Sequence, residues 1–215
     1  MPLDIKICGL STPETVAAAL DGGASHVGFI FFPKSPRNVT PADAGRLREA
    51  ARNRAQAVAV TVDASDDQLQ AIIDAMAPDI LQLHGKETPA RVAEVRERFL
   101  LPVMKAISVE TPDDLIHVHA YDEVADRLLL DAKAPKESQL PGGNGIAFDW
   151  RLVAALDTNL DYMLSGGLNA GNIAEALAIA NPPGIDVSSG VESAPGVKDV
   201  ERIRAFFAAV EAARG

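Results

Sequence analysis

Short apolar runs alternate with longer amphipathic runs eight times along this chain. The apolar runs predict strands at residues 3–8, 26–31, 57–62, 79–83, 102–107, 127–130, 162–164 and 185–187. Four of the intervening runs open with Thr-Pro, which is typical of a helix start because threonine caps the first turn and proline fits it. No Asn-Gly turn is placed to join two neighbouring strands as a hairpin, so the pattern favours parallel strands with helical crossovers.

Eight successive strand–helix units favour closure of the sheet on itself. We therefore expect an α/β fold, a single (β/α)8 barrel of eight parallel strands. No linker, low-complexity tract or change of composition divides the chain, so we expect one catalytic domain over residues 1–215. In such a barrel all strands end on one rim, where active sites lie, so function should be sought at the strand exits.

Composition excludes several classes of partner. The net charge is −10 and the pI about 4.8, which argues against a nucleic-acid surface because phosphates require basic patches. No apolar run reaches the roughly 18 residues of a membrane span. The single cysteine excludes an internal disulfide and suits a reducing compartment. The amino terminus lacks a basic segment leading into an apolar one, so we expect a cytoplasmic protein.

That single cysteine, Cys8, lies at the end of the first predicted strand. A lone cysteine is commonly a small hydrophobe in a core, but its place at a strand exit points to chemistry. The other exits carry Phe31 with the Arg37 loop, Asp63, His84, Ile107, Asp131, Gly166-Gly167 and Ser188-Ser189-Gly190. Taken alone, Asp63 could cap a helix, His84 could bind a carbonyl and Asp131 could pair with Lys133. Their gathering on one rim favours a functional site.

The last two exits predict a phosphate site. Glycine lets the backbone approach an anion closely, and barrels often bind phosphate on the loops after strands seven and eight. Gly166 and Gly167 lie on the first of these loops, and Ser189 and Gly190 lie on the second. A Gly-Gly pair alone is a weak signal, because ordinary turns use it too. Two such loops in the two expected places make a phosphorylated ligand the better interpretation.

Three further side chains indicate how the phosphorylated ligand is bound and which kind of reaction it undergoes. Arg37 carries a planar fork that suits a carboxylate or a phosphate, and we expect it across the rim from the phosphate loops. Cys8 and Asp131 can form a base–acid pair if cations ease ionisation of the thiol and burial lets the carboxyl keep its proton. Histidine and cysteine are too few, and wrongly spaced, for a metal cluster. The chain also lacks a dinucleotide-binding or Walker glycine pattern.

Seven segments together resemble one family. They are Lys6-Ile7-Cys8-Gly9, Ser35-Pro36-Arg37, Gln82-Leu83-His84-Gly85, Leu129-Leu130-Asp131, Phe148-Asp149-Trp150, Ser165-Gly166-Gly167-Leu168 and Asp186-Val187-Ser188-Ser189-Gly190-Val191-Glu192. In this order they look like phosphoribosylanthranilate isomerase of tryptophan biosynthesis. The resemblance implies a (β/α)8 barrel that rearranges N-(5-phosphoribosyl)anthranilate to its 1-deoxyribulose 5-phosphate isomer without a cofactor.

The resemblance also implies roles for individual residues. Asp131 would be the general acid, Cys8 the general base, and Arg37 the group that holds the anthranilate carboxylate. The seventh and eighth loops would bind the phosphate. The remaining residues expected at the substrate are His84, Asp186 and, in the glycine-rich loop after strand six, Gly145. Two departures concern neighbouring positions, because Asn144 stands where threonine is expected and Lys86 where an acidic residue is common.

Alternatives remain open at this point. Indole-glycerol-phosphate synthase should show a lysine acid, and the isomerase of the histidine pathway should use aspartates at strands one and five. A third alternative is a non-catalytic barrel that binds phosphosugars and has lost the acid–base pair. The partner we expect is the small phosphoribosyl substrate, with neither nucleic acid nor membrane. The protein should be a monomer or a homodimer.

Overall fold

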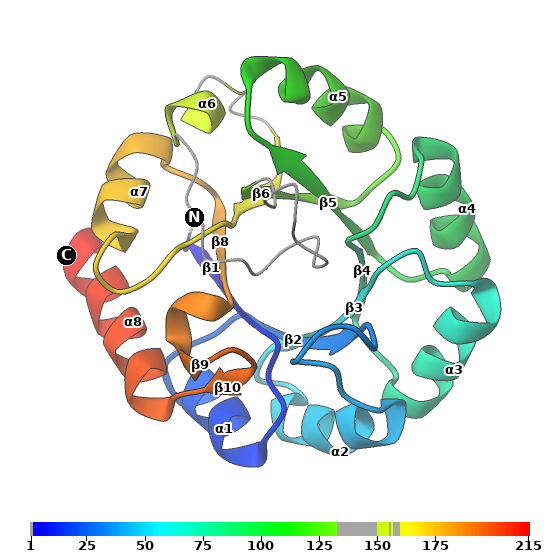
Figure 1. The fold of residues 1–215 in the computed structure, drawn as a ribbon, viewed down its shortest axis with the longest axis horizontal. Coiled ribbons are helices and arrows are strands. Elements are labelled where there is room, and N and C mark those ends of the chain that lie inside the picture. Colours follow the sequence, from blue (N-terminus) through cyan, green and yellow to red (C-terminus); the bar gives the residue numbers. More distant parts are fainter. Residues whose placement is uncertain (1, 133–149, 155, 157–159) are drawn as a thin grey trace.

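A closed barrel of eight parallel strands forms the centre of the molecule, and helices surround it (Figure 1). The structure, a computed structural model, describes residues 2–132, 150–154, 156 and 160–215. The strands are β1 (Asp4–Cys8), β2 (His26–Phe31), β3 (Gln56–Thr61), β4 (Ile80–Leu83), β5 (Val103–Val109), β6 (Arg127–Ala132), β7 (Tyr162–Leu164) and β8 (Gly184–Val187). The strand order follows the chain, and β1 pairs with both β2 and β8. The predicted (β/α)8 barrel is confirmed.

Side chains alternate between the two faces of the barrel wall. A small inner cluster fills the barrel and contains Cys8, Val58, Val60, Ile80, Met104, Ala106, Leu129 and Met163. A larger outer cluster packs between the strands and the helices. Because the strand period is two residues, a side chain two positions after an inner one also faces inward. Asp131 follows Leu129 in this way, and Cys8 is itself an inner residue.

The helices begin where local signals predict. They are α1 (Pro13–Asp21), α2 (Pro41–Ala51), α3 (Asp66–Met76), α4 (Pro89–Phe99), α5 (Ile116–Asp122), α6 (Arg151–Ala154), α7 (Ile173–Ala180) and α8 (Val200–Arg214), with 3-10 turns η1 (Pro112–Leu115) and η2 (Ser189–Val191). Thr12, Thr40 and Thr88 each accept a hydrogen bond from the amide three residues on, as helix caps do. Thr111 instead begins the 3-10 turn that leads into α5.

Several boundaries differ from those expected. The β5–β6 ladder continues through the pairs Ser108↔Asp131 and Val109↔Ala132, so both strands run two residues beyond their predicted ends and Asp131 lies within β6. α7 begins three residues later than predicted. The reason is that Asn169 and Asn172 use their side chains in turns: Asn172 Oδ1 accepts the Asn169 amide at 2.8 Å, and Asn169 Oδ1 accepts that of Gly171 at 2.8 Å.

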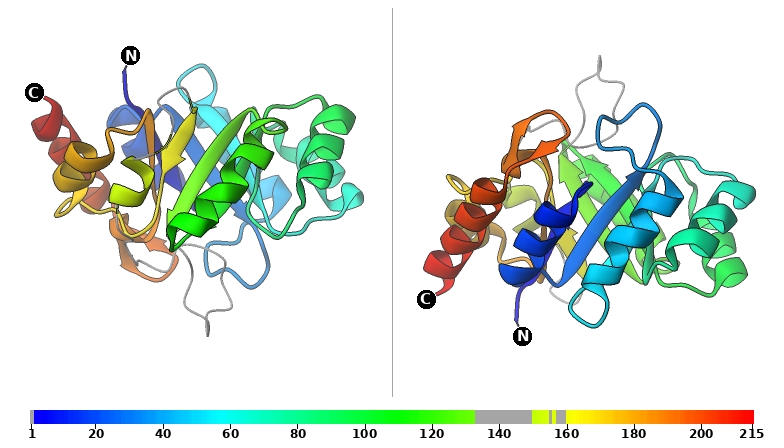
Figure 2. Two further views of the ribbon diagram at one scale, coloured as in Figure 1. Left: turned by 90° about the horizontal axis from the view of Figure 1, so that it is seen from above. Right: turned by 90° about the horizontal axis from the view of Figure 1, so that it is seen from below.

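An antiparallel hairpin was not predicted. It pairs β9 (Glu192–Ala194) with β10 (Val197–Lys198) and turns at Gly196, whose φ is +82°. A Cβ on Gly196 would lie 2.6 Å from the carbonyl oxygen of Pro36, so the hairpin packs against the loop after β2. Figure 2 shows the hairpin and this loop at the same end of the barrel.

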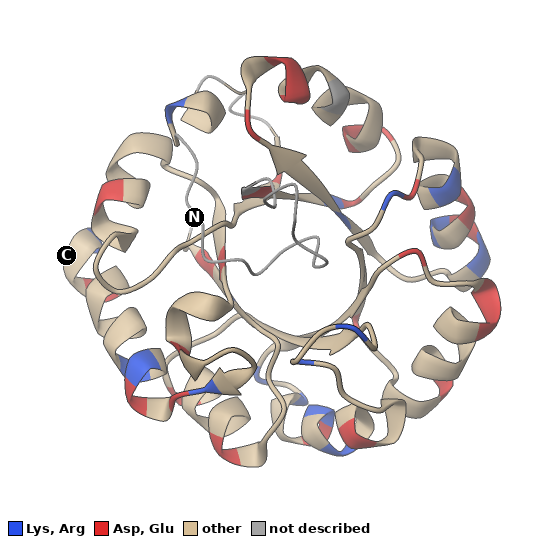
Figure 3. Cartoon of the chain, in the orientation of Figure 1, with Lys and Arg blue, Asp and Glu red and all other residues tan. Residues whose placement is uncertain are grey.

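Charged residues of both signs lie side by side on the outer helices (Figure 3). Many form exposed pairs one turn apart, such as Arg204 with Glu201, and such pairs contribute little to stability. Within the described part of the chain, no helix is long and apolar enough to cross a membrane. Buried charged pairs also occur, among them Lys6 with Asp186, Arg37 with Glu192 and Lys105 with Glu87.

Candidate active site

Cys8 ends β1 with its side chain buried inside the barrel. Glycines on either side make this possible. A Cβ on Gly28 of β2 would lie 3.0 Å from the Cys8 sulfur, so glycine there leaves room for the thiol. Gly9 has a φ of +78°, and a Cβ on it would lie 2.7 Å from Cδ of Arg37. The backbone therefore leaves β1 through a turn at Gly9 that packs against the aliphatic part of the Arg37 side chain.

A buried ion pair lies below Cys8. Lys6 faces the same side of β1, and its Nζ lies 2.9 Å from Oδ1 of Asp186 on β8. Ser165 Oγ donates to the other oxygen of Asp186 at 3.3 Å. Burial opposes the charge on Lys6, but Asp186 and Cys8 together outweigh burial and raise the pKa of the lysine. Lys6 is therefore a cation inside the barrel.

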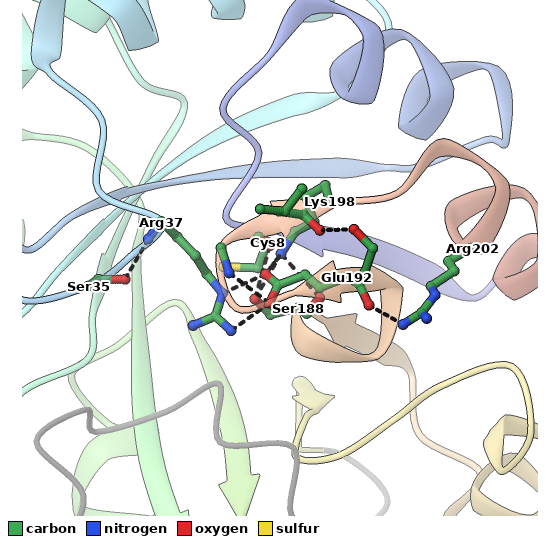
Figure 4. A network of polar contacts seen from close by, with 10 residues as sticks. Cys8, Ser35, Arg37, Ser188, Glu192, Lys198 and Arg202 are labelled. Atoms are coloured by element: carbon green, nitrogen blue, oxygen red, sulfur yellow. Dashed lines mark hydrogen bonds and ion pairs between the residues drawn. The ribbon is translucent and has the colours of Figure 1, made fainter.

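A second buried cluster lies beside Cys8 and joins the β2 loop to the hairpin (Figure 4). Arg37 Nε and Nη2 donate to the two oxygens of Glu192 at 2.6 and 2.9 Å. Lys198 Nζ also donates to Glu192, and it reaches the carbonyl oxygen of Ser188 at 3.1 Å. Ser188 Oγ in turn donates to the carbonyl oxygen of Cys8 at 3.1 Å. Glu192 thus pairs with two cations, Arg37 and Lys198, and Lys198 is linked through Ser188 to the backbone of Cys8.

These groups act on the thiol in opposite directions. Burial raises the pKa of Cys8, Lys6 lowers it, Asp186 raises it and Lys198 lowers it, and the net result lies above the ordinary value. Burial raises the pKa of Glu192 too, but Arg37 and Lys198 outweigh that effect and hold it below its usual range. For Lys198, burial outweighs Glu192, so the pKa of this lysine is lowered.

Asp131 is 3% exposed and faces inward from β6. Nε2 of His84, at the end of β4, lies 3.4 Å from Oδ2 of Asp131. On the other side of the ring, the side-chain nitrogen of Gln82 lies 2.9 Å from Nδ1. An amide that donates to Nδ1 leaves the imidazole proton on Nε2, where it faces the carboxyl group. His84 and Asp131 therefore form one polar group at the mouth of the barrel.

The loops after β7 and β8 come together as expected. Gly166 and Gly167 have φ values of +93° and +65°. A Cβ on Gly190 would lie 1.8 Å from the carbonyl oxygen of Leu168, so only glycine allows the two loops to touch. Among the described residues, the amides of Gly166, Gly167, Ser189 and Gly190 donate no hydrogen bond. Such clustered amides suit an anion.

Three other predictions concern the positions of Arg37, Asp63 and Gly145. Arg37 does not lie across the rim from the eighth loop, because β1 alone separates β2 from β8 in the closed barrel and the arginine reaches Glu192 just beyond that loop. Asp63 accepts the Lys86 amide at 2.6 Å, whereas Ser65 caps α3, so Asp63 organises a loop instead of capping the helix. Gly145, with the glycine-rich loop around it, lies outside the described residues.

Sequence reasoning assigned no role to Lys6, Lys198, Glu192 or Gln82. Lys6 had a usable signal, since it stands two residues before Cys8 in a strand and must share its face. Gln82 stands in the same relation to His84. Glu192 ends one of the segments that carry the family resemblance, but Lys198 had no signal, and the approach of both residues to Cys8 depends on the unpredicted hairpin. In the described segments, no group of three or more His, Cys, Asp or Glu residues could hold a metal ion.

Comparison with known proteins decides the family. Residues 5–209 match the family model of N-(5'-phosphoribosyl)anthranilate isomerase. This chain belongs to the phosphoribosylanthranilate isomerase family. Over 214 residues it is 66% identical to an N-(5'-phosphoribosyl)anthranilate isomerase from Mesorhizobium japonicum, a match that covers 100% of this chain and 98% of the relative.

Solved structures of the phosphoribosylanthranilate isomerase family agree with this assignment. The enzyme from Thermotoga maritima is 32% identical with a TM-score of 0.88, and the match covers 98% of this chain and 100% of that one. A second structure, of a phosphoribosyl anthranilate isomerase in complex with reduced 1-(O-carboxyphenylamino)-1-deoxyribulose 5-phosphate, is 31% identical with a TM-score of 0.85 over the same shares. The protein is therefore an isomerase of this family.

Proposed function

We propose that this protein converts N-(5-phosphoribosyl)anthranilate to 1-(2-carboxyphenylamino)-1-deoxyribulose 5-phosphate, a step of tryptophan biosynthesis. The rearrangement moves protons within one molecule, so we propose that it requires no cofactor. The observation that carries the proposal is the inward-facing thiol of Cys8 and carboxyl of Asp131 in a barrel whose 66% identical relative bears that enzyme name. The related structure with a reduced form of the product supports the same substrate class.

The first step requires an acid. Asp131 would donate its proton to the ring oxygen of the ribose, and the C1–O bond would break to give an open-chain iminium ion. Asp131 is buried and faces into the barrel, where its carboxyl group would meet the ring oxygen of the bound substrate. The adjacent His84 Nε2–H would stabilise the carboxylate left behind, because it lies 3.4 Å from Oδ2.

The second step requires a base. The positive iminium acidifies the neighbouring C2–H bond, so a thiolate is strong enough to remove that proton. Cys8 would take it and form an enolamine. This intermediate would lose the proton on O2 and gain one at C1, which gives the ketone. The Lys6 and Lys198 cations supply the neighbours that ionisation of the thiol requires.

Binding would use both ends of the substrate. The amides of Gly166, Gly167, Ser189 and Gly190 would hold the phosphate, since they cluster where two loops meet. Arg37 would hold the anthranilate carboxylate, and Glu192 would fix the plane of its guanidinium. His84 would support the acid, Asp186 would support Lys6, and Gly145 would belong to the loop that contacts the substrate. We further propose a single catalytic domain over residues 1–215, cytoplasmic, as a monomer or homodimer.

Fluorescence-monitored consumption of freshly generated phosphoribosylanthranilate tests the proposal. Wild type should consume it rapidly, whereas Cys8→Ser and Asp131→Asn should lose at least about 100-fold in turnover, because acid–base groups contribute about 10²–10⁴-fold. Both variants should still bind the reduced product, but Arg37→Ala should bind it more weakly. Folded wild-type protein that fails to accelerate consumption would refute the isomerase and favour a phosphosugar-binding barrel.

A further inference from the structure

Two buried lysines flank Cys8 from opposite ends of the chain. Lys6 lies on β1 and Lys198 on β10, and each is paired with its own buried carboxylate. We propose that Lys6 and Lys198 are positioning residues that favour the thiolate form of Cys8, the form that removes the proton. This role rests on the proposed function, in which Cys8 is the base. The thiol proton would leave to solvent before the sulfur accepts the proton from C2 of the sugar.

The place of Lys6 follows from strand geometry. It is fully buried, and both it and Cys8 lie against the same glycine on β2. A Cβ on Gly28 would lie 3.3 Å from Cε of Lys6 and 3.0 Å from the Cys8 sulfur, so the end of the lysine side chain and the thiol border the same small space beside this glycine. Lys6 therefore lies on the same face of β1 as the thiol, and its Nζ is paired with Asp186 of β8 at 2.9 Å.

Lys198 approaches Cys8 from the hairpin. Its Nζ donates to the carbonyl oxygen and, at 3.3 Å, to the hydroxyl of Ser188, which donates in turn to the carbonyl oxygen of Cys8. Lys198 is 8% exposed, and Glu192 holds it on the other side. A long flexible lysine would otherwise point to solvent. Packing fixes this one beside the backbone of the base.

The charges around the thiol come from four strands and one loop. Lys6 belongs to β1, Asp186 to β8 and Lys198 to β10, while Glu192 of β9 and Arg37 of the β2 loop lie one contact further away. Asp186 and burial oppose the thiolate, and the two lysines favour it. A nearby opposite charge shifts a pKa by about 1–3 units. Removing either lysine should therefore move the thiol further from its base form.

The test uses the fact that Cys8 is the only cysteine in the chain. Thiolate absorbance near 240 nm and iodoacetamide alkylation, each followed against pH, then report one group. We expect Lys198→Met to raise the apparent pKa of Cys8 by about one unit or more. At a pH below the pKa, a rise of one pKa unit lowers the thiolate fraction tenfold. The remaining thiolate is more nucleophilic, so the alkylation rate should fall only about three- to fourfold per unit.

Lys105→Met is the matched control. Lys105 is 2% exposed and paired with Glu87 at 2.7 Å, but it is not among the groups that shift Cys8, so the thiol pKa should stay at the wild-type value. The ascending limb of kcat/KM against pH should move with the thiol pKa in Lys198→Met. Circular dichroism checks folding, and Lys6→Met on a different strand gives a second test if Lys198→Met does not fold.

An unchanged thiol pKa in the folded lysine variants would overturn the proposal, whatever their activity. The thiol titration needs no substrate, so its outcome is separate from that of the isomerase assay. A raised pKa in a protein that does not isomerise phosphoribosylanthranilate would support the electrostatic role and refute the function. Full isomerase activity with an unchanged thiol pKa would support the proposed function and refute the electrostatic role of the lysines.

Discussion

Replacing Glu192 with glutamine should destabilise the protein strongly. The Glu192 carboxylate is surrounded by donors: Nε and Nη2 of Arg37 at 2.6 and 2.9 Å, the Gly196 amide at 3.1 Å, and Nζ of Lys198. Glutamine has the same shape, but its NH2 group would face a donor instead of accepting from one. It would also leave two cations without the anion between them.

The magnitude follows from burial. The side chains of Glu192 and Arg37 are 4% and 5% exposed, so water cannot replace the lost carboxylate. Removing one partner of a buried ion pair costs about 3–5 kcal/mol. A loss of 1 kcal/mol lowers the melting temperature of a protein of this size by about 2–4 °C, so Glu192→Gln should melt about 6–20 °C below wild type.

Thermal unfolding by circular dichroism measures this effect, with Glu201→Gln as the matched control. Glu201 pairs with Arg204 on the surface, where the two side chains are 78% and 65% exposed. Water and salt screen that pair, and its loss should change stability by less than about 1 kcal/mol. If Glu192→Gln melted within about 2 °C of wild type, the cluster would contribute no net stability and the reasoning from burial would be wrong.

Three further predictions concern pH and close contacts. Burial lowers the pKa of His26 to about 4, so this group should cost wild type about 3 kcal/mol of stability as pH falls from 6.5 to 4; urea unfolding should show a dependence on pH that is weaker in His26→Gln. Gly190→Ala places a Cβ on the Leu168 carbonyl and should raise KM about 10- to 100-fold; an unchanged KM would contradict the phosphate site. Gly28→Ala presses on the Cys8 sulfur and should lower kcat about tenfold in steady-state assays, with a wild-type rate as the contrary result.

The helix starts could be predicted from the sequence because their causes are local. Thr12, Thr40 and Thr88 each meet the amide they cap within one helical turn, so no distant residue is involved. Where tertiary contacts compete, local reasoning failed. Strands β5 and β6 extend beyond their predicted ends because the hydrogen bonds between them continue. Helix α7 begins after its predicted start because asparagine side chains form turns in place of its first helical turn.

The pattern of strands and helices was enough to place Cys8, Asp131 and the two glycine loops on one rim, because parallel strands in a closed barrel all end on the same side. The groups around the thiol could not be predicted in this way. Glu192 and Arg37 are 155 residues apart in the sequence, and Glu192 reaches the arginine from a hairpin of two short strands. Periodicity follows from neighbours along the chain, whereas the burial and pairing of a charge depend on groups that only the closed barrel brings together.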